Sequence, residues 1–159
     1  MNADSFRQLY DYHFALNRKL WDDCVAALTD EQFTADTPYS IGSVRNQTVH
    51  MLSVDDRWFC GLRGVELPDF LDPARFPTRD SVRARWDAVE ADMRAWLQTL
   101  TDAHLFEPFA EQLPLPRWQV LIHVINHGTD HRAQTLALLN SMGVETWGQD
   151  YIRYLMGRL

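Results

Sequence analysis

Three histidines recur at steps of four residues within one segment, L-I-H-V-I-N-H-G-T-D-H-R, as His123, His127 and His131. For a chain with this histidine content, two successive steps of four have a chance expectation of roughly 0.01. Residues four apart on a helix lie on adjacent turns of one face, so two imidazoles can converge on one metal ion at about 2.0 to 2.1 Å. The spacing therefore predicts a metal site on a helix.

Only two of these histidines fit comfortably around one ion, because His123 and His131 would lie about 12 Å apart along the helix axis. On a projection at about 100° per residue, His131 lies roughly 60°, His127 roughly 100° and His123 roughly 140° from the mean direction of the apolar residues. The projection favours His127 and His131 as the better-aimed pair. Gly128 lies between them and is expected to leave space beside the ion.

A metal site in a helical bundle also needs a ligand from a facing helix. Two other histidines can supply it: His13, in the middle of an apolar stripe, and His50, at the edge of one. Periodicity alone does not separate them. Either can instead be a half-buried histidine that a hydrogen bond satisfies, which is the commoner case for an isolated histidine on a helix.

The elements that must position these residues are four amphipathic helices, in which apolar residues recur at steps of three and four. Ser43 is a candidate N-cap for the second helix and Thr78 or Asp80 for the third, because their side chains accept hydrogen bonds from free backbone N–H groups. Gly61 or Gly64 ends the second helix. The predicted ranges are about Asp4 to Leu28, Ser43 to Gly61 or Gly64, Thr78 or Asp80 to Leu100, and Pro116 to Met142 with Gly143 as the terminator.

Shorter elements are expected between and after these helices. The T-D-E-Q pattern at Thr29 is a capping box and predicts a short extra turn. A last short helix is expected over 151–155. The segment between the second and third helices is predicted to be a loop, because it contains Pro68, Pro73 and Pro77.

The predicted fold is all-α, a four-helix bundle with long connections that forms one domain over residues 1–159. No strand is expected. Each of the three connections has about 14 to 16 residues, so a crossover topology fits as well as simple up-and-down order. One face of the third helix is predicted to be an ordinary solvated surface, with Arg83, Arg85, Glu90, Asp92 and Arg94.

Composition excludes several classes of protein. A chain of 159 residues with 46% hydrophobic residues can bury a core, and its net charge of −7 disfavours binding to nucleic acid. No segment reaches the roughly 18 to 20 apolar residues of a membrane span. Cys24 and Cys60 are far apart and the first residues are polar, so we expect a reduced, cytoplasmic protein without a secretory leader.

Two segments resemble the DinB family, in the DinB/YfiT-like superfamily of metalloenzymes: S-V-R-N-Q-T-V-H-M-L-S-V-D-D-R-W at 43–58 and H-V-I-N-H-G-T-D-H-R-A-Q at 123–134. The segment Y-D-Y-H-F-A-L-N-R-K-L-W and the closing Q-D-Y-I-R-Y-L are also similar, so the resemblance spans nearly the whole chain. Its specific part is H-x-x-x-H-R-x-Q together with an earlier histidine.

The resemblance implies a four-helix bundle, often dimeric, that holds a divalent metal with three histidines. Carried over by position, these ligands are His50, His127 and His131, which chooses His50 over His13. His123 then becomes an outer or packing residue. Imidazole ligands suit zinc or nickel, and iron or manganese are also compatible.

The sequence departs from the family pattern at one position, and the family's link to DNA damage does not imply DNA binding. Ala133 stands where many relatives have glycine, and we expect tighter packing there without loss of the metal. The founding members of the family are induced by DNA damage, which describes their regulation and supplies no DNA-binding chemistry.

Three neutral imidazoles leave coordination positions open, as in catalytic rather than structural sites. The segment H-G-T-D-H lacks the glutamate of H-E-x-x-H, which disfavours a zincin-type protease. Asp55 and Asp130 are candidate general bases, and each can instead orient a ligand or face water. Arg132 can be a surface charge or a holder of an anion. The six tryptophans are expected to be mainly core or interface anchors, although some can line a pocket.

These observations favour a metal-dependent enzyme that acts on a small molecule. Related branches of the superfamily include transferases and isomerases that use glutathione, mycothiol or bacillithiol, so the resemblance makes a thiol co-substrate plausible. The alternatives are a hydrolase that uses metal-activated water and a non-catalytic metal-binding stress-response protein. A helical interaction domain without metal would require the histidine spacing to be accidental. The family and the aromatic residues of the first and third helices predict a homodimer.

Overall fold

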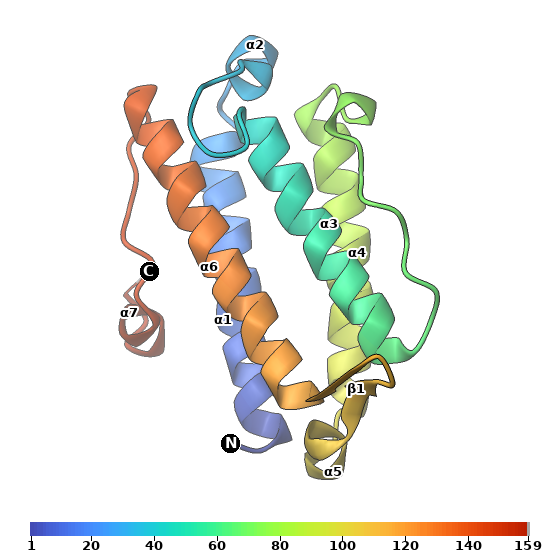
Figure 1. The fold of residues 1–159 in the computed structure, drawn as a ribbon. Coiled ribbons are helices and arrows are strands. Elements are labelled where there is room, and N and C mark those ends of the chain that lie inside the picture. The colour runs from blue at the N-terminus through green and yellow to red at the C-terminus, as the bar shows by residue number, and fades with distance from the viewer. Residues whose placement is uncertain (159) are drawn as a thin grey trace.

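Four long helices run side by side in the computed structural model, which describes residues 1–158 (Figure 1). Helix α3 packs against α4 and α6, and α1 packs against the same two helices. A small two-stranded antiparallel sheet lies at one end. The predicted all-α four-helix bundle is confirmed. The bounds are α1 Ala3–Leu20, η1 Trp21–Val25, α2 Asp30–Thr34, α3 Val44–Arg63, η2 Pro73–Arg75, α4 Arg79–Thr99, α5 Asp102–Phe106, β1 Pro108–Ala110, β2 Leu113–Pro116, α6 Arg117–Ser141 and α7 Tyr151–Leu155.

The four long helices have a crossover topology. In Figure 1 the connection from α3 to α4 returns along the length of the bundle, so that α3 and α4 run in the same direction and α6 runs opposite to both. We call this connection, residues 65–78, the crossover loop. It contains the three prolines of the predicted loop and only one short turn, η2. The crossover loop covers one side of α3 and therefore helps to shape the surface beside that helix.

The predicted helix ends agree closely with the structure. Ser43 accepts a hydrogen bond from the backbone N–H of Asn46 and starts α3, and Thr78 caps α4 in the same way. Thr29 forms the expected capping box at the start of α2. Gly64 ends α3 with φ +69°, a left-handed conformation that glycine adopts without strain.

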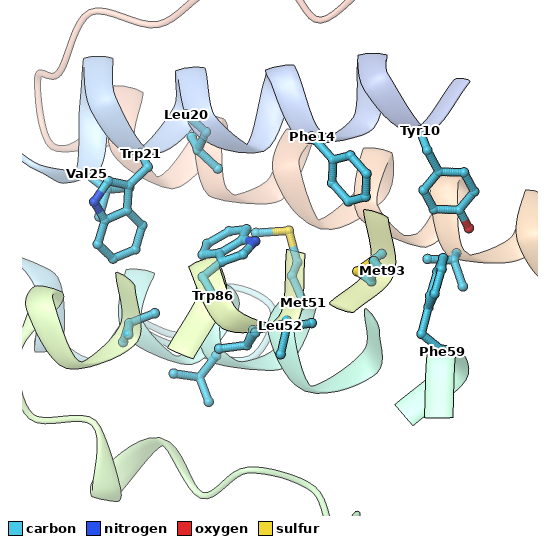
Figure 2. Close-up of a cluster of buried hydrophobic side chains, with 14 of the residues drawn as sticks. Tyr10, Phe14, Leu20, Trp21, Val25, Met51, Leu52, Phe59, Trp86 and Met93 are labelled. Carbon is cyan, nitrogen blue, oxygen red and sulfur yellow. The ribbon is translucent and has the colours of Figure 1, made fainter. Parts of the chain in front are cut away.

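The first predicted helix continues past α1 as η1, a single π-helical turn. A π turn contains more residues than an α turn and so changes which side chains face inward. Trp21 in η1 is buried, and its ring meets the edge of Trp86 from α4 at 5.8 Å between centroids. Figure 2 shows both rings in the core between α1 and α4.

Two elements near the end of α4 were not expected: the short helix α5 and the hairpin β1–β2. The hairpin has too few residues and too many prolines to show an alternating pattern. It packs on α3 through Phe109, whose Cζ would lie 2.4 Å from a Cβ at Gly61. Gly61 therefore provides the seat of the hairpin, whereas Gly64 ends the helix.

The prediction that Glu90 belongs to a solvated face is wrong. Glu90 is buried on α4 and forms ion pairs with Arg18 at 3.1 Å and with Arg94 at 2.8 Å. The side of α4 that carries it faces α1, where Arg18 lies, so the carboxylate is paired rather than hydrated. The other four residues named for that face are exposed or half-buried, as expected.

Aromatic side chains of α1 and α3 fill the core of the protein. Tyr10, Phe14 and Phe59 are nearly inaccessible to solvent, and the Tyr10 hydroxyl donates a hydrogen bond to the carbonyl of Leu121 (Figure 2). Because these rings are buried within one chain, they do not support a dimer, and the homodimer stays a prediction from the resemblance.

None of the described helices has the length and apolar character needed to cross a membrane.

Candidate metal centre

The seam between α3 and α6 brings together the three histidines that the resemblance selects. His50 lies on α3, and His127 and His131 lie one turn apart on α6. The Nε2 atoms of His50 and His127 are 3.1 Å apart, and one ring nitrogen of each histidine lies within 4.8 Å of the others. Within residues 1–158 this is the only group of at least three histidine, cysteine or acidic side chains that meets this distance. The group can hold a divalent ion.

The two remaining candidates lie outside this group. His123 is exposed, and its ring meets Trp58 at 5.1 Å between centroids, which fits the expected packing role. His13 is completely buried, and its Nε2 is 3.2 Å from Asp55. It is therefore one of the buried histidines that hydrogen bonds satisfy.

Gln47 holds His131 in one orientation. The Nδ1 of His131 lies 2.9 Å from the Oε1 of the buried Gln47, which can only accept a hydrogen bond. The amide nitrogen of Gln47 points to the Oε1 of Gln134 at 3.5 Å, and the hydroxyl of Ser40 also donates to Gln134. These contacts put the proton of His131 on Nδ1 and leave its Nε2 lone pair free for a metal.

Sequence reasoning did not single out Gln47, and it assigned no role to Gln134 although this residue closes the H-x-x-x-H-R-x-Q element. Both lie within the segments that resemble the family, and Gln47 precedes His50 by three residues, close to one helical turn. A polar residue one turn from a predicted ligand was the available signal. That it would face His131 could not be known, because this contact depends on how α3 and α6 are aligned.

The Gln47→Ala variant is expected to bind Zn²⁺ about 10- to 100-fold more weakly than the parent, because His131 would lose the partner that fixes its ring. Isothermal titration of the metal-free protein would measure the change. Gln47→Glu keeps an acceptor for the Nδ1–H group and should restore affinity to within about threefold of the parent. Equal losses in both variants would show that Gln47 acts only through packing.

All three histidines favour the neutral form. Burial is the main cause that lowers the pKa of His50, and the nearby His131 adds to it. Burial also lowers the pKa of His131. For His127, burial together with His131 and His50 lowers the pKa to about 4. Neutral imidazoles are the form that binds metal, so the group is ready for a ligand role at neutral pH.

The metal-free protein is expected to lose stability as the pH falls from 6.5 towards 4. In this window the unfolded chain protonates at His127, whose ordinary pKa is 6.5, whereas the folded chain resists protonation because its pKa is about 4. Urea denaturation with a chelator present would measure the trend. His127→Gln should reduce this loss of stability and His123→Gln should not; a parent midpoint that stays constant or rises on acidification would contradict the expectation.

Asp55 is buried, and its charge acts on His50 and His127. One carboxylate oxygen contacts His13, while Oδ1 is buried without a hydrogen-bond partner, as is the Nδ1 of His127. The negative charge of Asp55 counteracts the lowering of the His127 pKa. Asp130 is exposed on α6. Of the two candidate bases, only Asp55 therefore has a buried oxygen without a hydrogen-bond partner.

The expectation for Arg132 is corrected by its burial. It is completely buried and donates hydrogen bonds to Asn17 at 2.8 Å, Gln149 at 3.0 Å and Thr129 at 3.1 Å. Its Nη1 also lies 3.2 Å from the Nδ1 of His13. Burial lowers the pKa of Arg132 to about 10. Arg132 is neither a surface charge nor an anion holder, because its donors join α1, α6 and the segment after α6.

Two smaller expectations about α6 are also wrong. The space beside Gly128 does not belong to an ion, because the ring of His13 fills it: a Cβ there would lie 2.4 Å from Cε1 of His13. Gly128 is thus required for close packing of α1 on α6. Ala133 is exposed and cannot tighten the packing.

A hollow of about 320 Å³ opens beside His50. The crossover loop forms one wall with Phe70, Leu71 and Pro73, and the other lining residues are Ile41, Asn46, His50 and Ser53. Of the three grouped histidines, His50 lines this hollow, so a small molecule bound there would contact the histidine group through His50.

The fold and site define a helical bundle with a three-histidine group between two facing helices. The DinB family model matches residues 1–158, and the chain belongs to the DinB family. The resemblance found from the sequence is therefore confirmed over essentially the whole chain. No match was found among curated proteins.

Proposed function

We propose that this protein is a divalent-metal-dependent enzyme that acts on a small molecule, with His50, His127 and His131 as the metal ligands. The observation that carries the proposal is the convergence of three imidazoles, one of which, His50, lines a hollow. The free Nε2 of His131 and the low pKa of His127 fit a ligand role. Imidazole donors favour zinc or nickel over magnesium or calcium.

Three neutral ligands would not offset the charge of the ion, and a tetrahedral site would keep one position open. A divalent ion there would supply Lewis-acid chemistry, which favours loss of a proton from a thiol or water and polarises a carbonyl. A non-catalytic metal protein would be expected to complete the site with a fourth protein ligand. Among residues 1–158 no such residue joins the group.

Other residues of the chain would orient a ligand, exclude water and accept a proton. Gln47 would keep His131 oriented, and the apolar side chains of Ile41, Phe70 and Leu71 would exclude water from one side of the substrate. The free Oδ1 of Asp55 would be the acceptor for a proton that leaves the reacting group.

We propose a low-molecular-weight thiol as the co-substrate, such as glutathione, mycothiol or bacillithiol. With a chlorinated electrophile, the thiol loses its proton, the sulfur forms a bond to carbon, and the carbon–chlorine bond breaks to release chloride. The proton passes to a base and then to solvent. Membership of the DinB family supports this choice, and the reaction requires no further oxidant or reductant.

The test is thiol consumption with release of chloride by the metal-loaded protein and a chlorinated aromatic compound. Consumption above the uncatalysed rate, lost in His131→Ala but kept in His123→Ala, would support the proposal. No consumption with any of the three thiols would reject a thiol co-substrate.

A metal-dependent hydrolase is the second candidate, and the unpartnered Oδ1 of Asp55 favours it because hydrolysis needs a base for water. Turnover of activated esters or amides without thiol, reduced in Asp55→Asn, would support hydrolysis.

We also propose that the protein is a homodimer; light scattering that gives a monomer mass at micromolar concentrations would reject this.

A further inference from the structure

One face of α3 continues past His50 with residues that line a second hollow. Val54, Arg57 and Trp58 follow His50 at four, seven and eight residues, which is the spacing of one helical face. The second hollow has a volume of about 290 Å³, and we call it the arginine pocket. Its lining residues are Val54, Arg57 and Trp58 from α3, Leu67 and Phe70 from the crossover loop, and Phe109 and Leu113 from the hairpin region.

The arginine pocket adjoins the hollow beside His50, because Phe70 lines both. Apart from Arg57, all its lining side chains are hydrophobic. Phe70 is 63% exposed and Leu67 is 49% exposed, which is unfavourable for large apolar side chains unless a partner covers them. The walls therefore suit a ligand with an apolar body.

Arg57 is the only charged residue in this lining. Its guanidinium lies over the ring of Phe70, 4.1 Å from the centroid, and it donates a hydrogen bond to the carbonyl of Pro68. No carboxylate of the described residues lies within 4.0 Å of it, whereas most arginines of this acidic chain have one. Its remaining N–H groups can therefore serve an anion from outside the chain.

We propose that the arginine pocket binds an amphipathic carboxylate, whose carboxylate pairs with Arg57 and whose apolar body lies against Trp58 and Phe70. A guanidinium binds a carboxylate through two parallel hydrogen bonds, and the surrounding apolar walls strengthen this pair. The seven residues between His50 and Arg57 span about 10 Å along a helix. The carboxylate would thus lie about 10 Å from the metal ligands, with the reactive end of the molecule in the hollow beside His50.

This assignment of a substrate class rests on the proposed metal-dependent function, but binding in the arginine pocket does not. The two can therefore be tested separately. Octanoate, octanamide and octylamine share one alkyl chain and differ in charge, so they serve as probes. Isothermal titration of the metal-free protein, with a chelator present, would measure their affinities.

Octanoate is expected to bind with 1:1 stoichiometry and at least about tenfold more tightly than octanamide, because a hydrogen bond to a charged group is stronger than a neutral one. Octylamine should bind most weakly. Arg57→Met keeps the length of the side chain and should lower octanoate affinity at least about tenfold while leaving octanamide within about twofold. Arg75→Met, an exposed arginine of the same loop region, is the matched control and should change nothing.

Phe70→Ala should weaken octanoate and octanamide alike, because it removes the apolar wall. Equal affinities of octanoate and octanamide, or unchanged octanoate binding in Arg57→Met, would overturn the proposal. Light scattering that gives a dimer mass for the parent and a monomer mass for Arg57→Met would also overturn it. The pocket would then be covered by a second copy of the chain rather than by a carboxylate ligand.

The triple variant His50→Ala, His127→Ala, His131→Ala separates this proposal from the function proposed above. It should keep the octanoate affinity of the parent within about twofold. Octanoate binding without any metal binding by the parent would leave the arginine pocket standing and reject the metalloenzyme. Metal binding without octanoate binding would reject the arginine pocket and leave the proposed metal-dependent function standing.

Discussion

The His127→Ala variant is expected to bind Zn²⁺ about 10²- to 10³-fold more weakly than the parent protein. A four-ligand zinc site is worth about 10 to 16 kcal/mol, so a single ligand contributes roughly 2.5 to 4 kcal/mol. At about 1.4 kcal/mol per tenfold, that is the expected loss. The effect should be large because His127 is one corner of a tight triangle of histidines, with its ring centroid 5.1 Å from that of His50 and 4.4 Å from that of His131.

The matched control for this variant is His123→Ala. His123 lies on the same helix, one turn before His127, but it is exposed and outside the three-histidine group. We expect a change in affinity of less than about threefold, because no ligand is removed. Competition titration with a zinc indicator would measure both variants. Similar losses for both, or no loss for His127→Ala, would show that the ion lies elsewhere.

The Arg132→Met variant is expected to lose about 3 to 5 kcal/mol of unfolding free energy, the cost of removing one partner from a buried charged network. Arg132 faces Asp55 through His13: its Nη1 lies 3.2 Å from one ring nitrogen, and Asp55 lies 3.2 Å from the other. Without the guanidinium, Asn17 and Gln149 would also lose hydrogen bonds. Urea denaturation of the metal-free protein would measure the loss.

Two further variants separate a network from simple packing. Arg153→Met replaces an exposed arginine on α7 and should change stability by less than about 0.5 kcal/mol. Adding Asp55→Asn to Arg132→Met removes the buried carboxylate charge and should make the double variant at least about 1 kcal/mol more stable than additivity predicts. Strict additivity, or a loss below about 1 kcal/mol for Arg132→Met, would contradict a charged network.

The helices could be predicted because their signals are local. Ser43, Thr29 and Thr78 bond to backbone groups three residues later, and apolar periodicity reports the buried face of each helix. The histidine spacing on α6 is also local. The choice of His50 over His13 was not local and depended on the resemblance to the family.

The partners of the buried polar residues could not be predicted, because they are distant in the chain. His13 meets Arg132 across 119 residues, and Arg18 meets Glu90 across 72. Helical periodicity treats a polar residue as exposed, and only the packing of another helix shows whether a partner covers it. Gly128 is a related case, because its lack of a side chain serves the ring of His13 rather than an ion.

The hairpin was not predicted, and the crossover loop was predicted as a loop but its path was not, for a different reason. Both consist largely of residues without a repeating pattern, and several prolines prevent regular hydrogen bonding. Yet Phe70 and Phe109 from these segments line the arginine pocket, which adjoins the hollow beside His50. The parts of the chain with the weakest sequence signal therefore shape the surface that a substrate would meet.

The central claim is that three histidines of this DinB family member hold one divalent metal ion. Elemental analysis of the untagged protein, with the variant His50→Ala, His127→Ala, His131→Ala purified in parallel, tests it most directly. We predict close to one equivalent of a divalent metal in the parent and none in the variant. A parent that contains no metal, and takes up no zinc, nickel, iron or manganese on titration, would contradict the claim.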